Sequence, residues 1–141
     1  MDAGQTAGKD EDDLMKMIYG IGTDLTDVKR IEKLHQKYGR AFAERILHPV
    51  ELTEFSAAVR PSVFLAKRFA AKEAFAKAVG TGIRGAVSLQ HIGIGHDVLG
   101  KPEYFYAAPL QNWLDAQGIR RVHLSLSDED NHVLAFAIAE N

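Results

Sequence analysis

Residues 61–80 read PSVFLAKRFAAKEAFAKAVG and form the longest segment of the chain with helical periodicity. Proline suits the first turn of a helix, where its missing N–H leaves no hydrogen bond unmade, and Gly80 is typical of a helix end. Alanine, the strongest helix former, is frequent throughout the segment. We therefore predict a long central helix over residues 62–79.

Two charged stripes run along this predicted helix. Glu73 and Lys77 are four residues apart and share one face, whereas Arg68 and Lys72 lie roughly 120 to 180° further around. The Glu73–Lys77 spacing is also that of an ordinary surface ion pair, which contributes only about 0.3–0.5 kcal/mol. Apolar residues between two charged stripes favour a helix that lies in an interface or floors a cleft, although a solvated edge fits the same pattern.

The segment before the central helix predicts a strand followed by helices. β-Branched residues and glycines indicate a strand over residues 18–25, and apolar residues at helical spacing run from Val28 to Tyr38. Two shorter helices are predicted at residues 42–47 and 49–58.

After residue 85 the apolar period changes from 3.6 to 2, which is typical of strands. We predict strands at residues 87–94, 104–105, 122–127 and 133–139, a helix at 110–116, and turns at 95–102 and 128–131. The fold class is therefore α+β, with an antiparallel sheet and a long central helix.

Length and composition bound the remaining choices. A chain of 141 residues suits one domain, which we place at residues 17–141, and residues 1–16 are predicted to be an acidic tail, native or left over from cloning. The net charge of −2 carries no signature of a nucleic-acid or membrane protein. The absence of cysteine excludes thiolate metal sites and cysteine nucleophiles. We expect a cytoplasmic protein.

Asp24, near the end of the first predicted strand, has two interpretations that the residues leave open. It caps the following helix, with Asp27 three residues on, or it is a functional acid. A second acid, Glu73, lies in the middle of a mostly apolar helix, which makes the functional interpretation competitive.

The glycine cluster at residues 80–85 matches G-x-G-x-x-G only formally, because it ends a helix rather than opening one. It is either a helix cap with a turn or a cradle for an anion together with Arg84. The six histidines show no zinc pattern, and no serine nucleophile elbow is present. His123 alternates with core residues and is predicted to be a half-exposed strand residue.

Taken together, the strand at residues 21–25, the helix at residues 68–77 and the loop at residues 80–83 resemble one family. They are similar to the bacterial holo-acyl-carrier-protein synthases, which are small phosphopantetheinyl transferases. The resemblance runs from Met17 to the C-terminus and includes Gly100-Lys101-Pro102 and the strand at residues 123–125.

The resemblance implies transfer of the phosphopantetheine arm from coenzyme A to a serine of apo acyl carrier protein, in support of fatty acid biosynthesis, with adenosine 3',5'-bisphosphate leaving. Asp24 and Glu73 would then be Mg²⁺ ligands, since Mg²⁺ prefers oxygen ligands and bridges phosphates to one or two carboxylates. Lys77 would hold the diphosphate or assist the departing oxygen. Either Glu73 or a metal-bound water would be the base, and the sequence leaves this open.

The resemblance also implies three binding surfaces. Coenzyme A would contact Arg68, Lys72, Gly80, Gly82, Arg84, Lys101, Pro102 and His123. Acidic carrier protein would dock on Arg30, Arg40 and Arg45, although a solvated face fits these charges equally well. The family's small members are homotrimers with active sites between subunits, and we expect the same here.

This sequence departs from the family pattern at two positions. Thr26 stands where larger relatives have a second acid, so water would complete the metal shell, and Asp128 stands where some small relatives have histidine, which leaves its role open. One alternative function remains, a non-catalytic trimeric module that binds coenzyme A or a nucleotide. In that module Asp24 is a helix cap and Glu73–Lys77 a plain ion pair.

Overall fold

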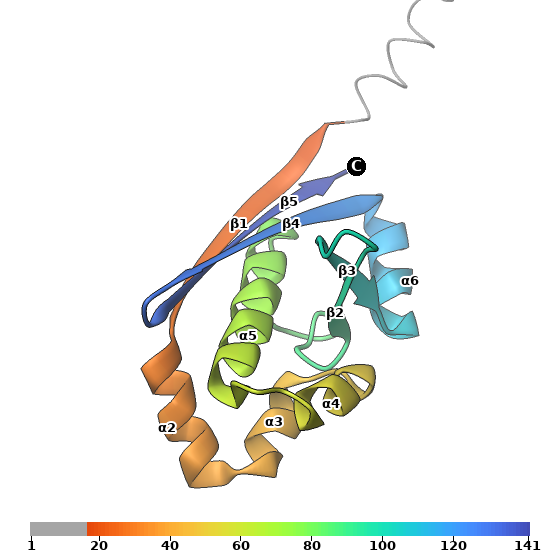
Figure 1. Cartoon of the computed structure of the whole chain (residues 1–141). Coiled ribbons are helices and arrows are strands. Elements are labelled where there is room, and N and C mark those ends of the chain that lie inside the picture. The colour runs from red at the N-terminus through yellow and green to blue at the C-terminus, as the bar shows by residue number, and fades with distance from the viewer. Residues whose placement is uncertain (1–16) are drawn as a thin grey trace, which may run out of the picture.

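A computed structural model describes residues 17–141, and the tail predicted over residues 1–16 lies outside them (Figure 1). The described chain contains, in order, β1 (Ile18–Asp27), α2 (Val28–Tyr38), α3 (Arg40–Ile46), α4 (Pro49–Ser56), α5 (Pro61–Ala78), β2 (Ile92–His96), β3 (Pro102–Tyr106), α6 (Ala108–Gln117), β4 (Arg121–Glu129) and β5 (His132–Glu140). The predicted α+β fold, with antiparallel strands and a long central helix, is confirmed.

Helix α5 is the centre of the molecule and lies between the β1–β5–β4 sheet and the β2–β3 hairpin (Figure 1). Its core positions are mostly alanine, and Ala66, Ala70 and Ala74 have no exposed surface. Small side chains let neighbouring backbones approach the helix closely on more than one side, which is why an alanine-rich segment forms the core here.

Strand β1 lies directly on α5 because two of its residues are glycines. A Cβ atom on Gly20 would come within 2.1 Å of the Ala78 carbonyl oxygen, and one on Gly22 within 2.1 Å of the Ala74 carbonyl oxygen. No other residue type fits at such separations. This close approach fixes how β1 sits along the second half of α5.

The strands divide into two sheets. β1, β5 and β4 form a three-stranded antiparallel sheet in that order, whereas β2 and β3 pair separately. Residue 24 of β1 pairs with Ala135 of β5, which in turn pairs with Leu126 of β4. The single antiparallel sheet expected from the sequence is therefore two sheets, because α5 lies between them.

The strand predicted at residues 87–94 is wrong in its first half, since β2 begins only at Ile92. Val87 instead closes a tight turn, with its N–H donating to the Arg84 carbonyl oxygen and its own carbonyl oxygen accepting from the Arg84 N–H. Val87 and Leu89 are apolar because they pack on the core from a loop, and this mimics the alternation of a strand.

Candidate active site

Asp24 lies within β1 and not at the start of a helix. The strand continues to Asp27, whose carboxylate accepts a hydrogen bond from the Lys29 N–H at 2.9 Å and caps α2. Asp24 is mostly buried, and its Oδ2 accepts a hydrogen bond from the Thr26 hydroxyl at 2.5 Å. The helix-cap interpretation of Asp24 is therefore wrong, and its carboxylate is available for another role.

Glu73 on α5 is electrostatically coupled to Asp24. Burial raises the pKa of the Glu73 carboxyl above its ordinary value, the Asp24 carboxylate raises it further, and the charges of Lys77 and Arg30 oppose this shift. Within residues 17–141 the Glu73 carboxylate takes part in no hydrogen bond or ion pair. The two carboxylates thus lie within range of each other's charge, and the Glu73 oxygens have no partner among the described residues.

Lys77, one turn beyond Glu73, reaches across to β1. Its ammonium donates a hydrogen bond to the Thr23 carbonyl oxygen at 2.8 Å and lies 3.7 Å from Asp24 Oδ1. The side chain is 54% exposed, so it can still contact a ligand. The plain Glu73–Lys77 surface ion pair is therefore not formed, and the structure brings all three predicted catalytic residues together.

These side chains are positioned by the packing of β1 on α5. Gly22, two residues before Asp24, lies against the Ala74 carbonyl oxygen and the Lys77 Cβ atom. The strand can therefore run close over the turn of the helix that carries Glu73 and Lys77. The site is built where two elements distant in sequence touch.

The donor set suits a hard divalent cation. Aspartate and glutamate oxygens are the ligands that Mg²⁺ takes, and a bound cation would offset both the burial and the Asp24 charge that raise the Glu73 pKa. Within the described residues no cluster of three or more histidine, aspartate or glutamate side chains could hold a metal. Asp24 and Glu73 are therefore the two carboxylates of this chain that could hold the ion, and Thr26 stands beside them as a hydrogen-bond donor to Asp24.

Three of the residues expected to contact coenzyme A line one cavity of about 260 Å³ between β3 and β4. Lys101, Pro102 and His123 face it together with Arg120 and Arg121. The sequence analysis missed the two arginines, although a doublet of basic residues at the start of a strand was a visible signal. His123 Nε2 contacts the Glu140 carboxylate.

The glycine loop after α5 forms the helix cap. Gly80 and Gly82 have φ angles of 89° and 67°, which favour glycine, and the Gly82 N–H donates to the Ala76 carbonyl oxygen at 3.1 Å. The cap interpretation is confirmed. Arg84 is exposed beyond the cap, so its guanidinium remains accessible to a ligand.

Lys72 does not occupy the position expected of a residue that binds coenzyme A. Its side chain has no exposed surface, and its ammonium donates to the carbonyl oxygens of Ile46 and Leu89 and to the Glu51 carboxylate. Burial lowers the pKa of Lys72 to about 8, although Glu51 opposes the shift. A ligand cannot reach this group, so the expectation for Lys72 is corrected.

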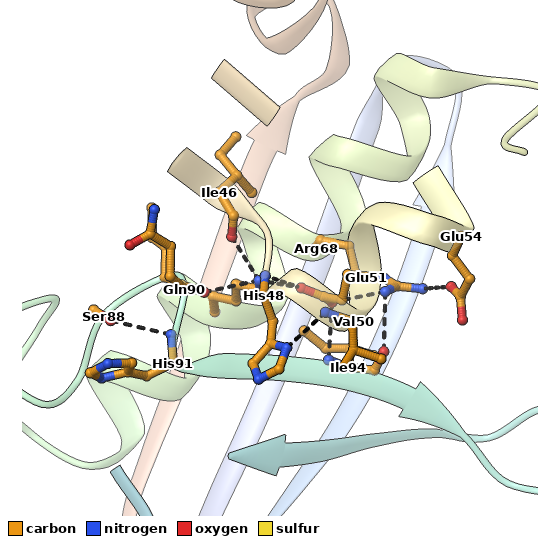
Figure 2. A network of polar contacts seen from close by, with 12 residues as sticks. Ile46, His48, Val50, Glu51, Glu54, Arg68, Ser88, Gln90, His91 and Ile94 are labelled. Atoms are coloured by element: carbon orange, nitrogen blue, oxygen red, sulfur yellow. Dashed lines mark hydrogen bonds and ion pairs between the residues drawn. The ribbon is translucent and has the colours of Figure 1, made fainter. Parts of the chain in front are cut away.

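Arg68 is also held inside the protein, as Figure 2 shows. It forms ion pairs with Glu51 at 2.8 Å and with Glu54 at 2.6 Å, and it donates a hydrogen bond to the Ile94 carbonyl oxygen. Its side chain is 6% exposed. Arg68 therefore belongs to the buried polar network, and it also lines the cavity of about 440 Å³ beside Lys67 and Asp128, so its contact with coenzyme A stays a prediction.

The three arginines expected to dock the partner lie on α2 and α3. Arg30 is exposed and close enough to Glu73 to affect its pKa. Arg40 pairs with Glu44 at 3.0 Å. Arg45 stands at an apolar cavity of about 600 Å³, whose walls include Leu34, Tyr38, Ala41, Phe42, Ile46, Phe69, Ile83 and Leu89.

Asp128, at the position of a family histidine, forms an ion pair with Lys67 at 3.3 Å. The two side chains line a cavity of about 440 Å³ that Arg60 and His96 also face. Within the described residues no helix is long and apolar enough to span a membrane.

Comparisons with known proteins agree with the geometry. Residues 20–137 match the family model of the 4'-phosphopantetheinyl transferase superfamily. A holo-[acyl-carrier-protein] synthase of Neisseria meningitidis serogroup A is 69% identical over 124 residues, which cover 88% of this chain and 99% of that protein.

Solved structures share the fold. The crystal structure of holo-[acyl-carrier-protein] synthase from Neisseria meningitidis has a TM-score of 0.87 at 66% identity, over 89% of this chain and 100% of that one. A Bacillus anthracis holo-(acyl-carrier-protein) synthase in complex with CoA (3',5'-ADP) has a TM-score of 0.74 at 38% identity, over 89% and 98%. Because the family model spans most of the chain and a curated relative is 69% identical, this chain belongs to the 4'-phosphopantetheinyl transferase superfamily.

Proposed function

We propose that this phosphopantetheinyl transferase moves the 4'-phosphopantetheine arm of coenzyme A to a serine of apo acyl carrier protein. The serine oxygen attacks the β-phosphorus, the bond from that phosphorus to the bridging oxygen breaks, and adenosine 3',5'-bisphosphate leaves. One observation carries the proposal, namely the coupling of Asp24 and Glu73 with Lys77 beside them. Relatives named for this reaction support it.

The proposal assigns Mg²⁺ to the Asp24 and Glu73 carboxylates. When bound, the ion would neutralise charge on the diphosphate and align it for attack. The oxygen donors and the repulsion between the two carboxylates support this assignment.

The chain's own residues do the remaining work. Lys77 is exposed and tethered to β1, so its ammonium can stabilise charge on the departing oxygen. Either the Glu73 carboxylate or a water molecule held beside it would accept the serine proton, and both routes stay within the proposal.

Coenzyme A would extend from this site over two surfaces. Gly80, Gly82 and Arg84 lie just beyond Lys77, and the cavity of Lys101, Pro102 and His123 lies between β3 and β4. We add Arg120 and Arg121 to the second surface because they place two more positive charges at the same cavity. The Bacillus anthracis relative was solved with CoA (3',5'-ADP), and a Helicobacter pylori relative with coenzyme A.

The carrier protein would dock on α2 and α3. Arg30 carries positive charge close to Glu73, and Arg45 stands at the rim of an apolar cavity. A basic rim around an apolar surface suits an acidic helical partner, because charge steers the encounter and apolar contact holds the complex.

The active assembly would be a homotrimer. The outer face of the three-stranded sheet exposes apolar side chains, with Leu25 67%, Ile21 59% and Leu134 47% exposed. Ile21 pairs with Ile138, and Leu25 with Leu134, so these side chains form one continuous patch. Large exposed apolar patches usually mark an interface, which supports sites completed by a neighbouring subunit.

A mass assay tests the reaction directly. Apo carrier protein, coenzyme A, Mg²⁺ and enzyme should give carrier protein with one added phosphopantetheine, seen by intact mass spectrometry. Chelation should stop the gain, and Glu73→Ala should slow it by about 10²-fold or more. A gain that survives chelation would contradict the metal assignment. Coenzyme A binding without any mass gain would favour a non-catalytic binding module.

A further inference from the structure

Glu51 is a buried carboxylate that the proposed reaction does not use, and its two oxygens accept four hydrogen bonds (Figure 2). Oε1 accepts from the His48 N–H at 2.9 Å and from the Lys72 ammonium at 2.6 Å. Oε2 accepts from Arg68 Nη1 at 2.8 Å and from the Ile94 N–H at 3.1 Å. The side chain is 1% exposed, so no solvent or ligand reaches it.

The two cations that contact Glu51 extend the network to other segments. Lys72 uses all three of its protons, donating to Ile46 and Leu89 as well as to Glu51. Arg68 donates to the Ile94 carbonyl oxygen as well. Through these bonds α5 is tied to the end of α3, the start of α4, the loop at Leu89 and the middle of β2.

Stability alone gives a weak reason for such a network. A buried ion pair is often no more stable than apolar residues of the same size, because both charges lose their hydration. Hydrogen bonds also constrain the relative positions of the groups that they join, since each one requires a particular distance and angle. Within the described residues every buried polar side-chain atom has a partner, so moving one of the joined segments away would leave a buried polar group without its partner, which is costly.

The joined segments flank both surfaces assigned to coenzyme A. The loop of Gly80, Gly82 and Arg84 ends in the segment that Lys72 holds at Leu89. Strand β2, held at Ile94, leads directly into the turn that carries Lys101. On α5, Lys72 is next to Glu73, so the same network connects the coenzyme A segments to the catalytic helix.

We infer that Glu51 is a positioning residue for coenzyme A, which acts through Lys72 and Arg68 to hold the loop at residues 80–91 and the β2–β3 hairpin in place against α5. The inference rests on the proposed function, since that function supplies the coenzyme A surfaces. Glu51 touches no substrate in this role. It limits the movement of the segments that bind coenzyme A relative to the carboxylates of Asp24 and Glu73.

The test is Glu51→Gln in the full-length enzyme, which keeps the shape of the side chain and removes its charge. We expect the KM and the calorimetric Kd for coenzyme A to rise about tenfold, because the binding segments would no longer be held in place before coenzyme A binds. A tenfold rise corresponds to about 1.4 kcal/mol of binding free energy. At saturating coenzyme A, kcat and the KM for carrier protein should change less than threefold, since Gly22 and Ala74 still hold β1 on α5. Backbone amides at residues 92–96 should exchange hydrogen faster.

Two controls separate positioning from general destabilisation. Glu54→Gln removes the exposed partner of Arg68 and should leave coenzyme A binding unchanged. Leu114→Ala, at a buried position on α6, should lower the melting temperature without raising the KM for coenzyme A. If Glu51→Gln does not fold, Lys72→Met replaces it, because that change releases Ile46 and Leu89 while leaving Glu51 paired with Arg68.

Two results would overturn the inference. One is a coenzyme A Kd within twofold of wild type in Glu51→Gln, or in Lys72→Met where that variant stands in for it. The other is an equal rise in Kd for Leu114→Ala at the same loss of thermal stability. If the wild type binds coenzyme A but modifies no carrier protein, the proposed function fails, while the Kd and the hydrogen exchange still decide the role of Glu51.

Discussion

Asp24 and Glu73 show how a single pair of residues becomes a site. Each is unremarkable in sequence, but the packing of β1 on α5 brings their charges together in a half-buried position, and this raises the Glu73 pKa. Thr26 donates a hydrogen bond to Asp24 instead of adding a third carboxylate. The two carboxylates therefore carry more negative charge than the single Lys77 ammonium beside Asp24 can neutralise.

Mg²⁺ should stabilise the protein in a pH-dependent way. Because the pKa of Glu73 is higher in the folded state, its contribution to the free energy of unfolding is present below the unfolded pKa and is lost as pH rises through the folded pKa. A bound cation offsets that loss. The rise in Tm with 10 mM Mg²⁺ should thus be larger at pH 8 than at pH 5, measured by calorimetry. An equal rise in Glu73→Ala would contradict the assignment.

Arg45 should matter for the carrier protein and not for coenzyme A. Removing its charge weakens steering of an acidic partner, so Arg45→Gln should raise the KM for carrier protein about threefold or more at low salt, with less effect at high salt. Gln117→Glu on α6 makes the same change in net charge far from α3 and serves as the control. Equal effects of the two variants would show that net charge alone is responsible.

At the scale of elements, β1 can contact α5 closely because Gly20 and Gly22 have no side chains. Sequence periodicity predicted both elements, but only the structure explains why β1 has glycine at alternate positions facing the helix. Along the same helix, Glu73 faces β1 while Lys72 faces α4 and the loop at Leu89. One helix thus carries the proposed catalytic side chains and a buried polar network on different sides.

Gly22→Ala should separate β1 from α5. The added Cβ would lie 2.1 Å from the Ala74 carbonyl oxygen and 2.6 Å from the Ala78 nitrogen, and both are backbone atoms that cannot move aside. We expect a loss of about 1–3 kcal/mol or more, as for other overpacked positions, together with a large loss of transfer activity. Denaturant unfolding and the mass assay measure the two effects.

Gly95→Ala is the matched control for this change. Its Cβ would meet only the Phe105 ring, at 3.8 Å, which is ordinary contact. Stability and activity should stay close to wild type. A tolerated Gly22→Ala would mean that β1 can shift without harm to the site.

At the scale of the whole molecule, the outer face of the three-stranded sheet lacks a cover within the described residues. Its apolar side chains come from β1 and β5, while the opposite face of the sheet packs on α5. A neighbouring copy of the chain is the partner that we propose for this patch. In a trimer each copy would present the patch to a different surface of the next copy, so that cyclic symmetry closes the assembly.

Leu25→Lys should therefore disrupt the proposed homotrimer. A charge in the centre of the patch would be buried without a partner, so light scattering should show smaller species and the mass assay a loss of activity. Val59→Lys, at a residue 95% exposed between α4 and α5, should leave both unchanged. A monomeric Leu25→Lys with full activity would contradict a site shared between subunits.

The sequence by itself determined most of the elements and the family, because these depend on local features, but it left the role of Asp24 open. Helical periodicity over residues 61–80, glycines in β1 and the alternation of β4 and β5 are readable without knowing what packs against them. The tertiary structure decided which charged side chains are enclosed and which stay accessible. Lys72 and Glu73 are neighbours in the chain, yet Lys72 is enclosed by Glu51 and Leu89, 21 and 17 residues away, while Glu73 stays accessible beside Asp24. Burial is set by these distant contacts, which no local pattern records.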